Sequence, residues 1–470
     1  MFESQGIPAV AICTDEFAPL GKEEAQVLGM AGLPIVTVPH PVTRLKKERV
    51  EELAEAALEE IIHVFSSPPD QLAKEYRRKG LAPGKVFKAK SLFVAPGAQK
   101  GKLKVTDSLE VINNLFYLRG WTDGLPIVPP TEERVTRILQ FTDHDPEELI
   151  ALIPPRWGKA TVKKIAINAV MAGCLPSYLP VILTAVEAIS DERFNLFGVQ
   201  TTTNPVAPLM VLNGPIAQEL EINSGYNVFG QGWRSNATLG RALRLILTNI
   251  GGGTPGVADR ATLGQPGKYS YCIAENEEQS PWDPLHVEKG FAKENSTVTV
   301  VGAAGPHNII SPGSKKADEV LETIARAMTA AGNNNLFMGP EAFLVLGPEH
   351  AALMAQAGIS KAEIRKFIFE KARVPSEKFS EGNMETILKW RPQAVIQEGG
   401  KTLVLVVEKP EDLYIVVAGG AGAHSLFTPL FFSKIVTRLI AYQDGDPIRS
   451  IKDFKPPLER GKNADCLGRP

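Results

Sequence analysis

Residues 1–41 read MFESQGIPAVAICTDEFAPLGKEEAQVLGMAGLPIVTVPHP, and this stretch indicates an α/β unit. The apolar run at 7–13 predicts one strand, and residues 33–38 predict a second. Between the two runs, the Thr14 hydroxyl can cap a helix that begins near Glu16. The order strand, helix, strand is that of a small α/β module at the start of the chain.

Three short motifs lie within the same stretch. They are Gly6-Ile7-Pro8, Thr14-Asp15-Glu16-Phe17 and Pro39-His40-Pro41. In this order they resemble the UGSC-like domain family, which is named for a selenocysteine-Gly-Ser-Cys motif or its all-cysteine version. The resemblance implies thiol or selenol redox chemistry and a reactive loop placed before the Gly-Ile-Pro strand. No such loop precedes Gly6, so the resemblance implies that a partner subunit carries the Cys or Sec loop.

Composition and charge limit the classes of function. The chain has 470 residues, a formal net charge of −2 and 44% hydrophobic residues. This charge balance gives no support for nucleic acid or an anionic membrane as a partner, and no run is apolar enough to span a bilayer. The N-terminus lacks the pattern of a secretory signal, and the four cysteines form neither a CxxC pair nor a zinc-ligand spacing. We therefore expect a reduced, cytoplasmic protein.

Gly, Pro and Lys content helps to divide the chain into segments. The alternation of predicted strands and helices predicts an α/β fold of several sheet-and-helix modules. The segments are a UGSC-like α/β module (1–81), a linker or arm (82–104), a helical and glycine-rich loop domain with the substrate site (105–294), an α/β domain (295–442) and an extended tail (443–470). The clearest predicted helices are 48–65, 69–78, 107–119, 161–172, 180–189, 237–249, 316–331, the one capped by Ser360, and 432–442. The clearest later strands are 297–301, 342–346, 403–407 and 413–417.

Four of the seven histidines follow a predicted strand closely, namely His40, His307, His350 and His424. Segments 297–311 and 413–428 both read as strand, small-residue turn, histidine and short apolar run. In open α/β sheets ligands bind outside the carboxyl ends of strands, where glycine lets backbone approach a ligand and imidazole can transfer a proton. We expect His307 and His424 to be acid–base groups or metal ligands; the alternative is that each caps a helix or faces water.

A second candidate lies in residues 267–291, where a cysteine, a histidine and several carboxylates are close in sequence. Glu275 and His286 are candidate acid–base groups. On a strand, His286 and Glu288 would share a face and could hold a transition metal. The alternative is a strand followed by a solvated acidic turn.

The glycine-rich loop at 222–242 is the predicted substrate site. Asn227, Trp233, Arg234 and Asn236 could orient a small polar or anionic molecule, with the Arg234 guanidinium as the anion clamp. The alternative is a loop whose polar side chains satisfy one another. Cys13 ends the first strand, where a neighbouring redox loop would come, and is the preferred reactive thiol.

Three hypotheses follow from these residues. The first is an enzyme subunit that acts on a small polar or anionic substrate by thiol-linked redox or carbon–sulfur bond chemistry, in a hetero- or homo-oligomer. The second is a self-contained metal-dependent lyase or hydrolase. The third is a non-catalytic scaffold subunit.

Overall fold

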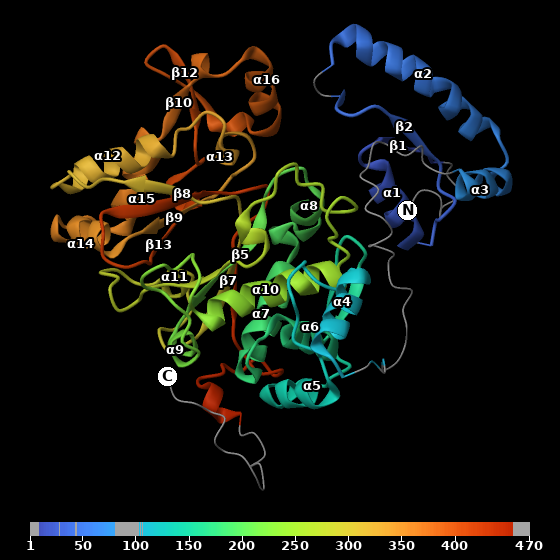
Figure 1. Cartoon of the computed structure of the whole chain (residues 1–470). Helices are drawn as coiled ribbons and strands as arrows, with labels where there is room; N and C mark the ends of the chain where they lie inside the picture. Colours follow the sequence, from blue (N-terminus) through green and yellow to red (C-terminus); the bar gives the residue numbers. More distant parts are fainter. Residues whose placement is uncertain are drawn as a thin grey trace.

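The computed structural model describes residues 9–79 and 107–454, except 28, 43 and 44, together with residues 103 and 105. Over this part of the chain it is a mixed α/β protein of several small sheets and the helices packed on them (Figure 1), which confirms the predicted fold class. Outside the described residues fall the Gly6-Ile7-Pro8 motif, nearly all of the expected linker and the tail beyond 454. No described helix has the length and apolarity needed to cross a membrane.

The N-terminal module has two parallel strands, with Ala11 opposite Ile35. Val64, Leu72 and Tyr76 form its small hydrophobic core. Its elements are β1 (Ala11–Thr14), α1 (Ala18–Val27), β2 (Ile35–Val38), α2 (Lys47–Ser66) and α3 (Pro69–Arg78).

Two of the motifs in this module meet at the carboxyl ends of β1 and β2. The Thr14 hydroxyl lies 3.1 Å from Nδ1 of His40, and the His40 backbone N–H donates to Oδ1 of Asp15 at 2.9 Å. The rings of Phe17 and His40 are 5.7 Å apart, centroid to centroid. Because the strands are parallel, residues that follow each of them share one edge, and this brings the motifs together.

A helical layer forms the middle of the chain around α7, whose sequence LPVILTAVEAI is apolar on nearly every side. Such a helix is stable only when it is enclosed, and ten of its eleven residues are buried. It packs against α6, α10, β7 and β15. The elements before the first long strand are α4 (Leu109–Leu118), α5 (Glu132–Ile138), β3 (Leu149–Ile153), β4 (Gly158–Thr161), α6 (Val162–Ala172), α7 (Leu179–Ile189) and α8 (Leu196–Thr201).

The larger core is closed by a four-stranded sheet of order β15-β7-β5-β6. Strands β5 and β7 are buried along their whole length, and most of their residues are apolar. The sheet takes strands from both sides of residue 294, so the expected domain boundary falls inside one hydrogen-bonded sheet. Its elements and the intervening helices are β5 (Ala207–Asn213), α9 (Pro215–Glu219), α10 (Arg234–Asn249), β6 (Cys272–Ala274), α11 (Leu285–Glu288), β7 (Thr297–Ala303) and β15 (Val436–Leu439).

The helix predicted over residues 432–442 is wrong, because this segment contains strand β15. Val436 lies opposite Val300 in the antiparallel ladder with β7. The Thr437 hydroxyl also lies 2.9 Å from that of Thr299. Cross-strand pairs of β-branched side chains stabilise a sheet, and here this tertiary pairing outweighs a helix-like apolar pattern.

A second four-stranded sheet, of order β13-β9-β14-β8, builds the C-terminal part. Strands β9 and β13 are parallel, and β14 runs antiparallel to both β9 and β8. Figure 1 shows α12, α14 and α15 grouped on one side of this sheet. Its elements are β8 (His307–Ile310), α12 (Ala317–Ala327), α13 (Asn334–Phe337), β9 (Ala342–Leu346), α14 (Pro348–Gln356), α15 (Lys361–Lys371), β13 (Leu413–Val417) and β14 (His424–Pro429).

The strands predicted at 342–346 and 413–417 are confirmed, and so is the capping box of α15, in which Ser360 and Glu363 bond each other's backbone N–H groups. A small antiparallel sheet of order β10-β12-β11 completes the C-terminal part. Its elements, with the helix between them, are β10 (Arg373–Pro375), α16 (Glu381–Trp390), β11 (Val395–Glu398) and β12 (Lys401–Leu405).

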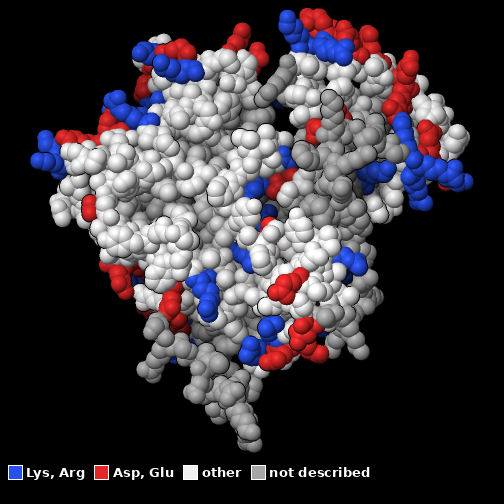
Figure 2. Space-filling view, viewed as in Figure 1, with Lys and Arg blue, Asp and Glu red and all other residues white. Residues whose placement is uncertain are grey.

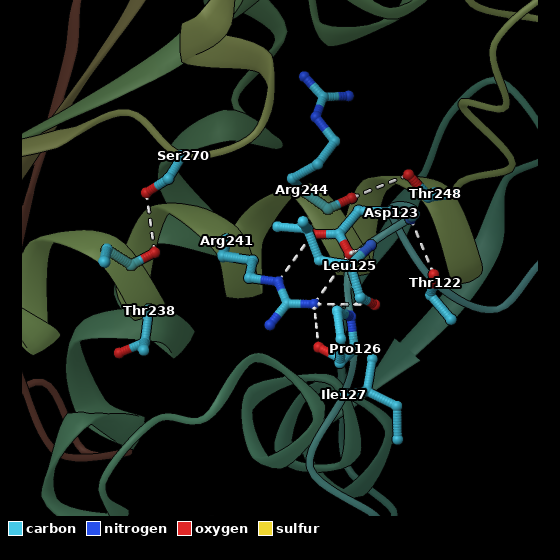
Figure 3. Close-up of polar contacts among 12 residues, drawn as sticks. Thr122, Asp123, Leu125, Pro126, Ile127, Thr238, Arg241, Arg244, Thr248 and Ser270 are labelled. Carbon is cyan, nitrogen blue, oxygen red and sulfur yellow. Dashed lines mark hydrogen bonds and ion pairs between the residues drawn. The ribbon is translucent and has the colours of Figure 1, made fainter. Parts of the chain in front are cut away.

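Helix α10 is fastened to the loop that follows α4 by one arginine (Figure 3). The Arg241 guanidinium forms a two-pronged ion pair with Asp123, at 2.7 and 2.9 Å. It also donates to the carbonyl oxygen of Pro126 at 2.8 Å. The Asp123 side chain is only 4% exposed, so this ion pair anchors the loop from the protein interior.

Replacing Arg241 by lysine should lower the free energy of unfolding by about 1.5 to 3 kcal/mol, because an ammonium cannot reproduce the planar fork. Chemical denaturation measures this loss. Arg326→Lys is the control, since Arg326 is 78% exposed in its pair with Glu322. That variant should change stability by less than about 1 kcal/mol. Equal effects in the two variants would show that Arg241 does not anchor the loop.

Candidate functional site

A pocket of about 430 Å³ lies at the carboxyl ends of the parallel strands β9 and β13. Strand β9 passes through Gly347 into helix α14, and β13 passes into the glycine-rich turn 419–422. This is the edge of an α/β sheet at which ligands generally bind. The pocket is lined by Gly225, Tyr226, Asn276, Gln279, Pro348, Glu349, Ala352, Gly419, Gly420 and Ala421.

Close backbone packing forms the pocket wall at Gly420. A Cβ atom added to Gly420 would lie 2.0 Å from Cδ1 of Tyr226, so the ring lies directly against the glycine backbone. The neighbouring Gly419 N–H donates to the carbonyl oxygen of Ser224 at 2.8 Å. The turn after β13 and the loop that begins at residue 222 are therefore joined, and any side chain at Gly420 displaces Tyr226.

Buried amides hold the other end of that loop. Oδ1 of Asn236 accepts the Asn223 backbone N–H at 2.8 Å, and its amide donates to the Cys272 carbonyl at 3.1 Å. The Asn223 amide in turn donates to the carbonyl of Tyr226 at 2.9 Å. Asn236 thus connects α10, β6 and the loop, and its polar atoms serve the fold.

The other three predicted substrate-binding residues also lie outside the pocket lining. Asn227 has a φ of 58° and donates to the carbonyl of Gln231 at 2.8 Å, so its side chain closes its own loop. Trp233 and Arg234 are exposed at the start of α10. The loop does reach the pocket, but through Tyr226.

Two of the predicted strand-end histidines lie near this pocket, at the same edge of the sheet. Buried His350 is in the first turn of α14, and its Nδ1 lies 2.8 Å from the Ser425 hydroxyl. His424 precedes Ser425, and its carbonyl oxygen accepts the Gly347 N–H at 3.2 Å. Burial, and next the nearby His424, lower the pKa of His350, which favours a neutral imidazole.

His307 does not join them. In the pairing of β8 with β14, His307 lies opposite Phe427, whereas His424 lies opposite Ile310. Side chains alternate between the faces of a sheet, so these registers place His307 and His424 on opposite faces. Each histidine also begins a strand, so neither caps a helix. His307 and His424 therefore do not share one site as candidate acid–base groups.

One turn joins the pocket to a buried polar network. Asn276 and Gln279 line the pocket. Glu275, between them and β6, points inward: its Oε2 accepts the Asn213 amide at 2.7 Å and the Leu285 N–H at 2.8 Å. A change of charge at Glu275 therefore acts one residue away from the pocket wall.

Glu275 faces a buried lysine. Its Oε1 lies 3.7 Å from Nζ of Lys361 and has no hydrogen-bond partner among the described residues. The ammonium also donates to the carbonyl of Asp283 at 2.7 Å and to Glu288 at 3.2 Å. Burial raises the pKa of Glu275 above the ordinary carboxyl value, and the charge of Lys361 opposes that shift.

The predicted metal ligands His286 and Glu288 do not converge. They lie on α11, a short helix, so the shared face expected of a strand is lost. His286 is fully buried with Nδ1 3.8 Å from Glu277, while Glu288 pairs with Lys361 and Arg365. Within the described ranges, no group of three or more His, Cys, Asp or Glu side chains could hold a metal ion.

The thiols that the structure describes are poor nucleophiles. Cys13 is half-buried on β1, and burial raises its pKa. Burial also raises the pKa of Cys174 and Cys272. Because the thiolate is the reactive form, burial disfavours the reactive form of all three. Cys466 lies outside the described residues.

Sequence comparison agrees with the organisation of the N-terminal module. Residues 1–67 match the UGSC family, which confirms the resemblance seen in the motifs around Thr14 and His40. No curated protein shows a significant match to the chain.

Only a weak sequence signal marks the pocket residues that lie outside the predicted site. Gly419-Gly420-Ala421-Gly422 follows a predicted strand, and Gly347-Pro348-Glu349 follows another, which marks both as turns at strand ends. Lys361 carries no such signal, because its burial beside Glu275 depends on the packing of α15 against α11.

Proposed function

We propose that the chain is the substrate-binding subunit of an enzyme that acts on a small polar molecule held in the pocket at β9 and β13. The observation that carries the proposal is the lining of that pocket: glycine backbone on one side, with Asn276, Gln279 and Glu349 around it. Ligand sites combine such a concave wall with a few polar groups that fix orientation, and about 430 Å³ suits a small metabolite.

The lining favours a ligand with both donors and acceptors. Asn276 and Gln279 each offer an amide N–H₂ and a carbonyl oxygen, and Glu349 offers a carboxylate. Tyr226 adds an aromatic face and a hydroxyl group. A hydroxylated or amino-bearing molecule of metabolite size matches this set, and the Glu349 carboxylate favours a ligand amino group.

We further propose that the reaction is thiol-linked redox or carbon–heteroatom bond chemistry, with the Cys or Sec group on a loop of a partner subunit. The UGSC match of residues 1–67 supports this reaction class. The raised pKa of Cys13 speaks against that thiol as the nucleophile. Figure 1 also places the N-terminal module on the opposite side of α8 and α10 from β13 and α14, which favours a thiol from another chain.

A small-metabolite panel of amino acids, hydroxy acids and sugar phosphates, scored by thermal shift and then by calorimetry, tests the pocket. We expect at least one compound to bind, and Gly420→Ala to weaken its binding about tenfold or more, because the new methyl displaces Tyr226 from the wall. Gly420 has no positive φ, so the substitution adds no backbone strain.

Gly313→Ala is the matched control, since a Cβ there meets nothing within 4 Å and its φ is also not positive. It should bind the same compound as wild type does. A compound that binds Gly420→Ala and wild type equally would place its site elsewhere. No binding across the panel would overturn the substrate-binding role and favour the non-catalytic scaffold.

A further inference from the structure

A group of partly buried cations, Arg244, Arg260 and Lys268, lies on α10 and in the loop that follows it. Arg244 and Arg241 leave this helix in different directions, and Figure 3 shows Arg244 turned away from the Asp123 ion pair. Nε of Arg244 donates to the Lys268 carbonyl at 2.9 Å, and Nη1 donates to Oε1 of Gln200 at 3.2 Å. Both of these partners are neutral oxygens.

The carboxylate nearest to Arg244 is already engaged. Asp259, 9% exposed, accepts from Nζ of Lys268 at 2.6 Å. Among the described residues, no carboxylate forms an ion pair with the Arg244 guanidinium. Burial lowers the pKa of both Arg244 and Lys268, and the Asp259 carboxylate opposes that shift in each.

Arg260, the residue after Asp259, shows that a cation in this region pairs with a carboxylate. Its side chain is 7% exposed and is paired with Glu16, which belongs to the N-terminal module. The cluster thus holds Arg244, Lys268 and Arg260 against Asp259 and Glu16, which leaves an excess of one positive charge. Figure 2 shows blue and red side chains in the hollow between the N-terminal module and the rest of the chain, over α8 and α10.

We propose that the cation cluster of Arg244 and Lys268 is a binding site for a small oxyanion, a phosphate or a carboxylate group. The hydrogen bonds of the Arg244 guanidinium go to neutral oxygens, and a phosphate or carboxylate fits its planar fork in two-pronged fashion. The carboxylate of Glu16 on the neighbouring Arg260 is an example from within the chain. This site is separate from the pocket at β9 and β13 and does not depend on the function proposed for that pocket.

Titration of the full chain with inorganic phosphate and with acetate, at an ionic strength held constant with chloride, tests the site by calorimetry and thermal unfolding. We expect one or both anions to bind, and Arg244→Met to weaken binding about tenfold or more. Arg234→Met, on the same helix, is the control and should bind as wild type does. Because phosphate also stabilises proteins non-specifically, the comparison of the two variants is decisive.

A second variant, which removes a negative charge from the cluster, tests the proposal if Arg244→Met does not fold. Asp259→Asn removes the competing carboxylate, so the anion should bind several-fold more tightly. Phosphate binding alone would assign a phosphate site, and acetate binding alone a carboxylate site. Absence of binding in wild type, unchanged binding in Arg244→Met, or no gain in Asp259→Asn would each overturn the proposal.

Discussion

Replacing Lys361 by methionine should lower the free energy of unfolding by about 3 to 5 kcal/mol at neutral pH, the usual cost of removing one partner of a buried ion pair. Lys361 is 4% exposed and neutralises Glu275, which has no exposed surface on its side chain. Methionine keeps the length of the chain and removes the charge, so Glu275 is left as a buried, uncompensated anion. Urea denaturation measures the loss.

The loss should depend on pH in a defined direction. Burial holds the pKa of Glu275 above its unfolded value, and removing Lys361 raises it further. The folded variant therefore binds a proton that the unfolded chain does not, and its stability increases as pH falls through the raised pKa toward the ordinary carboxyl value. We expect Lys361→Met to lose less stability at about pH 5 than at about pH 8.

Two comparisons isolate the ion pair. Lys163→Met removes an exposed partner of Glu147 and should cost less than about 1 kcal/mol. Adding Glu275→Gln to Lys361→Met should restore part of the stability, because the unpaired charge is gone. If the double variant were as unstable as the sum of the two single variants, Glu275 and Lys361 would not be coupled.

Replacing Gly214 by alanine should lower the free energy of unfolding by a similar amount, at least about 3 kcal/mol. Backbone strain and overpacking contribute together. Gly214 joins β5 to α9 with a φ of 87°, a region that side chains disfavour. A Cβ there would lie 2.3 Å from the carbonyl oxygen of Asn295 and 2.7 Å from Cα of Ser296. Backbone on both sides leaves no flexible group that could move aside.

Gly290→Ala separates the two contributions. Gly290 has a φ of 89°, and a Cβ there meets nothing within 4 Å. It therefore carries the conformational cost alone, about 1 to 2 kcal/mol. The midpoint temperature of thermal unfolding should be well below that of Gly290→Ala in the Gly214→Ala variant. Equal midpoint temperatures would show that the close approach of Asn295 is relieved at little cost.

The parts of the fold that the sequence predicted best are those with a local signal. Helix α2 was expected over 48–65 and spans Lys47–Ser66, because its apolar period needs no information from elsewhere. The strands at 342–346 and 413–417 likewise carry short β-branched and aromatic runs. Segment 432–442 failed because its apolar spacing also fits a helix, and only the ladder with β7 determines that it forms a strand.

The site was harder to predict because it also depends on long-range contacts. Strand ends followed by glycine pointed to the correct edge of the sheet, and His350 and His424 do lie there. Which loops meet at that edge depends on long-range packing, so the sequence does not single out Glu349, and within the loop at 222–242 it favours Asn227 and Arg234 although Tyr226 lines the pocket. His307 was placed with His424 from matching flanks, which carry no information on strand register.

The late position of β15 in the sequence has a consequence for synthesis of the protein. Its partner β7 ends at Ala303, while β15 begins only at Val436. As the chain leaves the ribosome, the outer edge of the buried, apolar β7 stays unpaired until the last strand has emerged. Such an edge can recruit a strand from another nascent chain. Messages that terminate early should therefore yield aggregates, and chaperone binding should be concentrated in the interval between these two strands.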